Sequence, residues 1–273
     1  MTPSPAPGSG TIELPAERLH EALKTSFKDL FARLEGARIE ERTGYLFLVC
    51  PLLPLPQLNG VWAQERKEEQ TAVRELEEAI TEIERLDLPC WVQTRAGRTP
   101  TLEAEARRLG FTSQESVPAL LATPDDLHDI AGAGLEIARI ADTAGLAQAQ
   151  AVATAGFEAP PALFRPFYTP QVAAAPGLSM YVALADGTPV STAIGFTQGE
   201  AVGIFNVATP PKHRRRGYGT AVTARALSDG FKSGASFGWL QSSPLGESLY
   251  RRMGFRQVET YTLLSRPQDG PGQ

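Results

Sequence analysis

Asn206–Thr220, with the sequence NVATPPKHRRRGYGT, is the stretch of the chain that decides the fold. It joins the strand-like run AVGIFNVAT to a helix expected over Tyr218–Lys232, and it carries a basic run at Lys212–Arg216 followed by Gly217 and Gly219. Free N–H groups and the positive dipole end at a helix start hold anions, and glycines let the backbone approach them closely. Arginine side chains add charge-assisted contacts to phosphate. The junction therefore favours a phosphate-bearing ligand.

A solvated basic loop is the other interpretation that stays open for this run. Nucleic acid is not expected as a partner, because the chain has a net charge of -5 and no aromatic platform stands beside the basic residues. The Gly-x4-Gly-Lys-Ser/Thr order of a Walker loop is missing, and only two of the three glycines of a dinucleotide fingerprint are present. Two interpretations of the basic run therefore remain: a binding site for a phosphorylated cofactor, or a loop exposed to solvent.

Length and composition indicate two folded domains and no membrane span. A chain of 273 residues, 42% hydrophobic and 21% charged, is longer than one ordinary domain. The longest apolar run, YLFLVCPLLPLPQL, is interrupted by three prolines and is too short to cross a bilayer. The opening residues 1–10, MTPSPAPGSG, are typical of a disordered tail rather than a signal peptide. We therefore expect a cytoplasmic protein without a membrane partner.

The cysteines and histidines suggest no metal site. Cys50 and Cys90 stand inside apolar strand-like runs, where both are expected to be small buried hydrophobic residues. The three histidines, His20, His128 and His213, are far apart in the sequence and have no nearby cysteine. No metal cofactor is predicted.

The order of periodic segments predicts two domains, 11–124 and 134–267, separated by the Asp- and Gly-rich segment PDDLHDIAGAG. In each, strands alternate with helices, which predicts a mixed sheet with helices on both sides. The first is expected to hold helices over 15–34, 67–86 and 101–109, with strands in ARIEERTG, YLFLVCPLL, PCWVQT and ESVPALLAT. The second is expected to hold helices in TAGLAQAQAVATAGF, 218–232 and PLGESLYRRM, with strands in LEIARI, SFGWLQS and VETYTLLS. Three more strands are expected in LSMYVALADGTPVSTAIGFTQGEAVGIFNVAT, joined by turns at ADGT and TQGE.

The two halves also repeat one pattern. LPCWVQT followed by TLEAEARRLGF in the first half is similar to FGWLQS followed by GESLYRRMGF in the second. Both read as a strand, a short helix and R-R-[LM]-G-F before another strand. The pattern indicates an ancestral duplication, although helices that end in Gly-Phe also arise by chance.

The junction resembles the central motif of the GNAT superfamily of N-acetyltransferases: Arg or Gln, two residues, Gly, any residue, then Gly or Ala, after a strand and opening a helix. Arg214, Gly217 and Gly219 take those places. A second family motif, S-P-x-G-x-x-L-Y-x-x-x-G-F after a strand, is matched by LQSSPLGESLYRRMGF at 240–255. The resemblance covers Leu135–Arg266. It implies an α/β fold of two tandem GNAT-like domains, each a central mixed β-sheet flanked by helices.

This resemblance also implies acetyl-CoA as cosubstrate and assigns residues to it. The backbone of Val207–Thr209 would pair with the pantetheine arm, and the amides of Arg215–Thr220 would hold the pyrophosphate. Ser243, which also reads as a helix N-cap before Pro244, would lie close to the coenzyme. The residues predicted to bind the coenzyme are Val207, Ala208, Thr209, Arg214, Arg215, Arg216, Gly217, Tyr218, Gly219, Thr220 and Ser243.

Tyr250 matches the family's frequent general acid. A phenol with a reference pKa of about 10 can protonate the leaving thiolate, but Tyr250 could instead simply pack beside Leu249 and Phe255. An amine acceptor must first lose a proton, yet the strands AVGIFNVAT and SFGWLQSS contain no acid. Glu200 is the nearest acid and reads as a turn residue, whereas Asn206 could only position water, so the general base stays unassigned.

Aromatic residues in FEAPPALFRPFYTP lie where the family's acceptor-side loop lies. They could line an apolar acceptor pocket or pack between the domains. The residues are Phe157, Phe164, Phe167 and Tyr168.

The first half lacks a counterpart of the glycine junction. The residues AQERKEEQ stand there instead, without glycine and with an excess of acid that would repel phosphates. It resembles a degenerate GNAT repeat, as in tandem GNAT proteins of the mycothiol synthase type, and is expected not to bind acetyl-CoA.

The function expected is acetyl transfer to an amine of a small molecule or peptide by direct attack in a ternary complex. A non-catalytic acyl-CoA sensor and a structural protein that has lost the cofactor are the alternatives. Monomer and homodimer both stay open.

Overall fold

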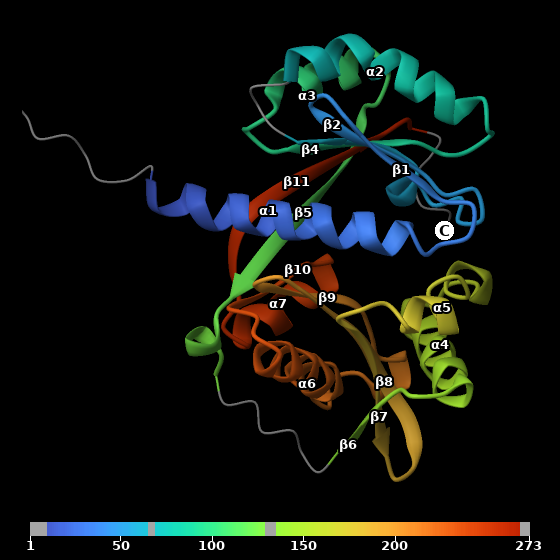
Figure 1. Ribbon diagram of the computed structural model, residues 1–273, viewed down its shortest axis with the longest axis vertical. Helices are drawn as coiled ribbons and strands as arrows, with labels where there is room; N and C mark the ends of the chain where they lie inside the picture. The colour runs from blue at the N-terminus through green and yellow to red at the C-terminus, as the bar shows by residue number, and fades with distance from the viewer. Residues whose placement is uncertain (1–9, 65–68, 129–134, 268–273) are drawn as a thin grey trace, which may run out of the picture.

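The computed structural model describes residues 10–64, 69–128 and 135–267 of the chain. Its strands form one continuous 11-stranded mixed sheet that runs through both halves (Figure 1). The first half contains α1 (Gly10–Phe31), β1 (Arg38–Arg42), β2 (Tyr45–Val49), β3 (Gly60–Ala63), α2 (Glu69–Glu84), β4 (Trp91–Arg95), α3 (Pro100–Arg108) and β5 (Ser113–Ala122). The second contains β6 (Glu136–Arg139), α4 (Thr143–Phe157), α5 (Pro170–Ala173), β7 (Leu178–Ala185), β8 (Thr188–Gln198), β9 (Ala201–Ala208), α6 (Tyr218–Lys232), β10 (Phe237–Gln241), α7 (Pro244–Arg252) and β11 (Arg256–Ser265).

The strand order shows an exchange between the halves. The order is β1-β2-β3-β4-β11-β5-β10-β9-β8-β7-β6, so β11 of the second half lies between β4 and β5 of the first. In turn, β5 pairs with β10, and Trp239 lies opposite Leu121. Each half thus adds its final strand to the sheet of the other, and the long β5–β11 antiparallel pair joins them at the centre (Figure 1).

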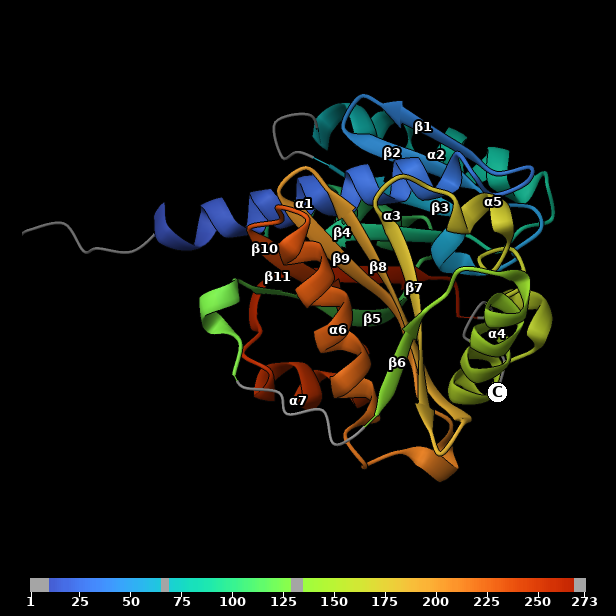
Figure 2. The same ribbon diagram turned by 60° about the horizontal axis from the view of Figure 1, so that its bottom comes forward.

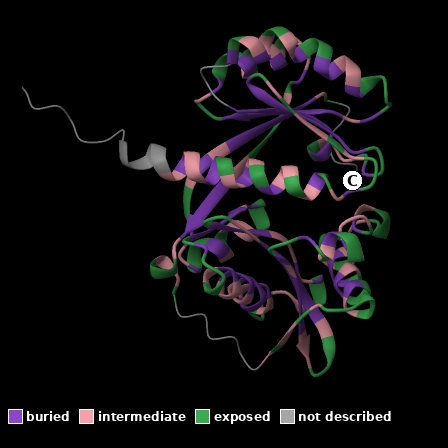
Figure 3. Cartoon of the chain, in the orientation of Figure 1, coloured by how far each residue is buried: buried purple, intermediate pink, exposed green. Residues whose placement is uncertain are grey.

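Three apolar clusters hold helices on both faces of this sheet. Strands such as β2, YLFLV, are buried on both sides, and successive residues alternate between the two faces. On one face, α2 and α3 cover the first half and α6 and α7 cover the second, each pair with its own cluster. On the other face, α1, α4 and α5 share a single cluster with strands of both halves. Figures 2 and 3 show α1 lying across the sheet between the halves, with the buried residues concentrated in the strands.

Most of the predicted elements and the mixed sheet with helices on both sides are confirmed. The helix predicted over 218–232 has the same bounds as α6, and the helix predicted over 67–86 is α2, Glu69–Glu84. Gly60–Ala63 forms β3, a strand that is not among the predicted ones, and the strand exchange is also a difference from the predicted arrangement. Cys50 and Cys90 are both buried, as expected.

Two further predictions concern residues that lie largely outside the described part of the chain. The tail predicted for residues 1–10 lies outside them except for Gly10, which begins α1, and the linker is described only through His128. Among the described helices, none has the length and apolar character needed to cross a membrane.

Candidate functional site

The site predicted from the sequence lies where two parallel strands separate. β9 and β10 pair from Ala201–Phe237 to Gly203–Trp239, after which β9 continues to Ala208 without β10. On its other side β9 carries a bulge, because its register against β8 shifts between the Phe205 and Ala208 pairs. Beyond Gly203 the edge of β9 therefore has no strand partner on the side of β10, and this separation of the two strands is called the gap between β9 and β10 below.

The loop after β9 leads into α6 with a series of amides that lack a partner. The backbone N–H groups of Arg215–Thr220 donate to no oxygen within the described residues, and the first bonded amide is that of Ala221, 2.9 Å from the carbonyl oxygen of Gly217. Gly217 is the N-cap residue of α6 and has φ 80°. These consecutive donors at the positive end of a 15-residue helix form an anion-binding cradle.

The two glycines of the cradle have different roles. A Cβ on Gly217 would meet nothing within 4 Å, so glycine is needed there for its positive φ rather than for space. A Cβ on Gly219 would lie 3.4 Å from Thr209 Oγ1, 3.5 Å from Leu249 Cδ1 and 3.9 Å from Val207 Cγ1. At Gly219, the end of β9, the start of α6 and the body of α7 therefore come together.

The Arg214 side chain ties this loop to the end of β9 and to the C-terminal end of α4. Its Nε donates to the carbonyl oxygen of Thr209 at 3.1 Å and its Nη2 to that of Gly156 at 2.8 Å, and it pairs with Glu158 at 3.1 Å. Gly156 and Glu158 stand at the C-terminal end of α4, where Glu158 has φ 53°. The Arg214 side chain is thus engaged within the protein, whereas Arg215 and Arg216 are exposed and form no ion pair with a described residue.

Two of the three carbonyls predicted to meet pantetheine already have partners. Ser191 Oγ donates to the carbonyl oxygen of Ala208 at 2.9 Å, and the carbonyl oxygen of Thr209 receives Arg214 Nε. Ser191 Oγ also lies 2.9 Å from Thr209 Oγ1. The backbone of Val207 is left as the most accessible hydrogen-bonding edge among these residues.

Tyr250 and Ser243 lie on α7, beside the cradle. Ser243 is an N-cap, with its Oγ accepting from Gly246 N at 3.3 Å, as the sequence suggested. Tyr250 is 8% exposed and packs edge-to-face on Phe255 with the ring centroids 5.9 Å apart. Burial raises the pKa of the Tyr250 phenol above its usual range, so it stays protonated at neutral pH. Packing is therefore observed, and a role as proton donor stays a prediction.

Glu200 does not lie where a general base is needed. It precedes β9, at the end opposite to Ala208, and forms an ion pair with Arg18 of α1 at 2.6 Å. The Arg18 guanidinium holds the pKa of this carboxyl below its usual range, so it stays ionised and paired. Asn206, in contrast, is on β9 at the bulge and has φ 47°.

The four aromatic residues of the acceptor-side loop divide by exposure. Phe164 and Tyr168 are 8% and 5% exposed and belong to the cluster under α1 and α4. Phe167 packs against that cluster, and Phe157 is 48% exposed and stacks on Phe164 with the ring centroids 5.4 Å apart. Packing explains Phe164, while Phe157 presents a free ring face.

A cavity of about 570 Å³ lies elsewhere, between β7, β8 and the C-terminal part of α6. Three of its lining side chains contact one another, because Tyr181 Oη and Arg225 Nε each lie 3.0 Å from Asp229 Oδ2. The length of α6 separates this cavity from the cradle at Gly217. It is not part of the predicted site.

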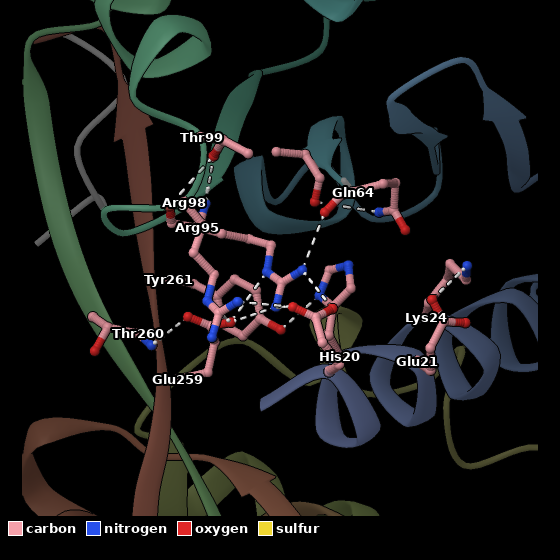
Figure 4. A network of polar contacts seen from close by, with 12 residues as sticks. His20, Glu21, Lys24, Gln64, Arg95, Arg98, Thr99, Glu259, Thr260 and Tyr261 are labelled. Atoms are coloured by element: carbon pink, nitrogen blue, oxygen red, sulfur yellow. Dashed lines mark hydrogen bonds and ion pairs between the residues drawn. The ribbon is translucent and has the colours of Figure 1, made fainter. Parts of the chain in front are cut away.

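In the first half, β3 and β4 correspond to β9 and β10 and stay paired farther along the strands. β3 and β4 pair from Gly60–Trp91, the counterpart of Gly203–Trp239, through Trp62–Gln93, so they stay joined for two more residues. Beyond them Arg95 Nη1 donates to the carbonyl oxygen of Gln64 at 3.3 Å and bridges the strand ends. Figure 4 shows Arg95 in a network that includes Glu259 and Tyr261 of the exchanged strand.

The helices of the first half also lack the features of the site. α2 begins at Glu69, which is buried and accepts the amide of Leu102 at 2.8 Å, whereas α6 begins beside two glycines. α3 and α7 are both nine residues long, begin with proline and end in Arg-Arg, and in this alignment Ala106 stands where α7 has Tyr250. Residues 65–68 of AQERKEEQ lie outside the described part of the chain.

Comparison with known proteins agrees with this geometry. Residues 148–255 match the model of the acetyltransferase (GNAT) family. The match places a GNAT acetyltransferase domain at residues 148–255. The matched residues include the separation of β9 from β10, the cradle and α7 through Phe255. No curated protein sequence matches the chain.

Several solved structures share the GNAT fold across most of the chain. A GCN5-related N-acetyltransferase from Kribbella flavida is 23% identical with a TM-score of 0.69, over 92% of this chain and 95% of that one. Another, from Sphaerobacter thermophilus, is 17% identical with a TM-score of 0.61, over 92% and 86%. A tandem GNAT protein from the clavulanic acid biosynthesis pathway is 14% identical with a TM-score of 0.55, over 84% and 79%.

Proposed function

We propose that this chain is an acetyl-CoA-dependent N-acetyltransferase that acts on an amine of a small molecule or peptide by direct attack in a ternary complex. The coenzyme would bind to the second half, 134–267, and the first half, 11–124, would serve as a degenerate scaffold. The observation that carries the proposal is the run of unpaired amides at Arg215–Thr220, at the start of α6 and beside the gap between β9 and β10.

The residues present fit such a coenzyme. Six consecutive amides and the start of α6 suit the pyrophosphate, with Arg215 and Arg216 exposed beside them. The free edge of β9 around Val207 suits the amide groups of the pantetheine arm, which would pair with it as a neighbouring strand does. The thioester supplies an activated acyl group.

The reaction also requires one proton to be donated to the leaving sulfur and one to be removed from the acceptor. As the amine nitrogen attacks, its bond to the acyl carbon forms, the carbon–sulfur bond breaks, and the electron pair stays on sulfur. Tyr250, kept neutral by burial, would give its proton to that sulfur and be reprotonated from solvent. The acceptor must also release one proton, and neither β9 nor β10 carries an acidic residue to take it.

Calorimetry and thermal unfolding with acetyl-CoA test the coenzyme site. Binding should raise the Tm with a stoichiometry of one per chain. Gly217→Glu should weaken binding more than 100-fold, because it places a carboxylate against the phosphates and a side chain at φ 80°. Gly187→Glu is the matched control, since Gly187 has φ 73°, equally open surroundings and a place in the β7–β8 turn. A wild-type chain whose Tm ignores acetyl-CoA would contradict the proposal.

A non-catalytic acyl-CoA sensor is the second candidate, favoured by the lack of an acidic residue on β9 and β10. A panel of primary amines that includes aminoglycosides, amino acids and peptides separates the two. Release of free thiol above the rate without amine supports the enzyme. Tight binding of acetyl-CoA with no release for any amine supports the sensor.

A further inference from the structure

The cavity of about 570 Å³ between β7, β8 and α6 has no part in the transfer reaction proposed above. The residues that β7 and β8 direct toward α6 here are small, and Ser179, Gly195 and Thr197 form its floor. A Cβ on Gly195 would lie 3.2 Å from Ala226 Cβ, so α6 is already in contact with the sheet beside the cavity. The space is therefore left by short side chains and not by a helix that stands away from the sheet.

Positive charge surrounds this cavity. Three basic side chains line it, Arg139 of β6 and both Arg225 and Lys232 of α6. One carboxylate, that of Asp229, stands against them, and its Oδ2 is already 3.0 Å from Tyr181 Oη and from Arg225 Nε. Arg139 and Lys232 are exposed and form no ion pair or hydrogen bond with any residue that the structure describes. Three cations and one anion leave an excess of two positive charges, although the whole chain has a net charge of -5.

Arg225 is fixed in position at the edge of the sheet. Its Nη1 donates to the carbonyl oxygen of Ile137 at 3.1 Å, which ties α6 to the edge strand β6 (Figure 2). Its Cζ lies 5.7 Å from the ring centroid of Tyr181, and Arg139 stands opposite Tyr181 in the β6–β7 register. Two arginines thus border the cavity beside one tyrosine, and the forked N–H donors of a guanidinium match the oxygens of a carboxylate or a phosphate.

The C-terminal end of α6 does not oppose an anion at this place. A helix end of this kind carries partial negative charge on carbonyl oxygens that lack partners. In α6 the carbonyl oxygens of Asp229–Phe231 accept the amides of Ser233–Ala235 at 3.0–3.1 Å, and Lys232 stands in the last turn. Because these carbonyls are bonded within the protein, the excess of basic side chains sets the sign of the potential in the cavity.

We propose that this cavity binds a small metabolite with a phosphate or carboxylate group, whose oxygens contact Arg139, Arg225 and Lys232. A volume of about 570 Å³ is within the range of small-molecule sites and admits a ligand larger than an inorganic anion. The hydroxyl groups of Ser179 and Thr197 suit a polar remainder, such as a sugar or a hydroxy acid. The site lies apart from the cradle, so it stands or falls independently of the proposed function.

Calorimetry with inorganic phosphate and with citrate, in separate titrations, tests the proposal. The parent protein is Gly217→Glu, whose added carboxylate keeps anions from the cradle. At least one of the two anions should bind with a stoichiometry of one. Arg139→Ser combined with Lys232→Ser should weaken this binding about tenfold or more, with little change in Tm because both side chains are exposed. Arg215→Ser combined with Arg216→Ser is the matched control, since it removes the same charge at the cradle, and it should leave the affinity within about twofold of the parent.

Ser179→Leu separates a built cavity from a general attraction to positive charge. It fills the floor and leaves every charge in place, so it should also weaken binding about tenfold or more. A crystal structure with the bound anion should place an oxygen within about 3.2 Å of the Arg225 guanidinium. Phosphate binding alone would indicate a phosphorylated ligand, and citrate binding alone a polycarboxylate.

The proposal is overturned if neither anion binds, or if the loss of Arg139 and Lys232 or the filling at Ser179 weakens binding by less than this amount. Failure of the wild type to bind acetyl-CoA would instead overturn the proposed function and leave the anion measurements unaffected.

Discussion

The two halves of the molecule are built on similar strands and helices, but their parallel strand pairs end at different places. In the second half, β9 and β10 separate directly after Gly203–Trp239, whereas in the first half β3 and β4 stay paired for two more residues after Gly60–Trp91. A short extension of one strand pair and a different helix start therefore distinguish the first half, called the closed half below, from the second, called the open half. The fold alone does not decide whether a half could bind a coenzyme.

The closed half fills the corresponding space with buried charge. Arg95, 3% exposed at its side chain, contacts Glu259, 4% exposed, at 2.6 Å and Glu17 of α1 at 3.0 Å (Figure 4). His20 of α1 lies 2.8 Å from the hydroxyl of Tyr261 beside them. Glu259 and Tyr261 both belong to β11, so the exchanged strand supplies much of what closes the first half.

The ion pairs of Arg95 with Glu259 and Glu17 are called the plug below. Breaking the plug should have the largest effect on the free energy of unfolding. Arg95→Ala leaves Glu259 buried with only Arg98 nearby at 3.3 Å, and removing one partner of a buried ion pair costs about 3 kcal/mol. Urea unfolding measures the loss. Arg38→Ala, on a residue 48% exposed, should cost less than about 1 kcal/mol. Equal losses in the two variants would show that burial does not matter here, and a second bound acetyl-CoA in Arg95→Ala would show that the plug alone closes the half.

Tyr250→Phe sharpens the comparison at the position where the first half has Ala106. Loss of the phenolic proton should slow thiol release by about 30- to 100-fold in kcat, while acetyl-CoA affinity changes little because the ring stays packed on Phe255. Rapid-mixing and calorimetric measurements separate the two quantities. Tyr45→Phe, a buried tyrosine of β2, serves as control. An unaltered kcat would make Tyr250 a core residue, equivalent in role to Ala106.

His20 should make the closed half sensitive to acid. Burial, together with the charges of Arg95, Lys24 and Arg98, lowers its pKa to about 3, whereas the unfolded value is about 6.5. The unfolded chain therefore binds the proton first, and stability falls as the pH falls below 6.5. Between pH 7.5 and pH 5 the titration of His20 should lower the free energy of unfolding by about 2 kcal/mol. His20→Asn should lose about 2 kcal/mol less stability than the wild type over this range, because it lacks the titrating imidazole; parallel curves of the two proteins would refute the assignment.

Arg214→Ala should have the smallest of these effects, on the open half. It removes the brace between the cradle and the end of α4, so the affinity for acetyl-CoA should weaken by about five- to tenfold, or about 1 kcal/mol. Arg225→Ala is the control, since Arg225 also bonds to a carbonyl oxygen and an acid but lies farther along α6, beside the 570 Å³ cavity. Equal weakening by both variants would mean that Arg214 has no special role in the cradle.

Local patterns in the sequence were enough to predict most helices and strands, since the spacing of apolar residues is written within each segment. They could not predict the strand order. β5 and β11 both follow an R-R-[LM]-G-F turn, both begin polar, and both end in buried residues, so either strand suits either neighbour. Pairing partners far apart in sequence decide the order, and a single sequence does not show them.

The candidate site likewise has features that the local sequence predicts and features that depend on tertiary contacts. The unpaired amides at Arg215–Thr220 follow from glycines beside a helix start, a local signal that the sequence displays. The bonds of Arg214 to the end of α4 and the bulge at Asn206 against β8 depend on contacts between distant segments. No spacing rule joins Arg214 to Gly156, so only the folded chain brings them together.

The exchange of β5 and β11 constrains how the protein is made. Arg95 of β4 lies opposite Tyr261 of β11, so the sheet of the first half is incomplete until Arg256–Ser265 has left the ribosome. Until then the edge of β4 stands open to other chains, for a time set by an elongation rate of about 5–20 residues per second. The first half would thus be the first to be synthesised and among the last to close, and its misassembly, rather than any loss of chemistry, would limit the yield of active enzyme.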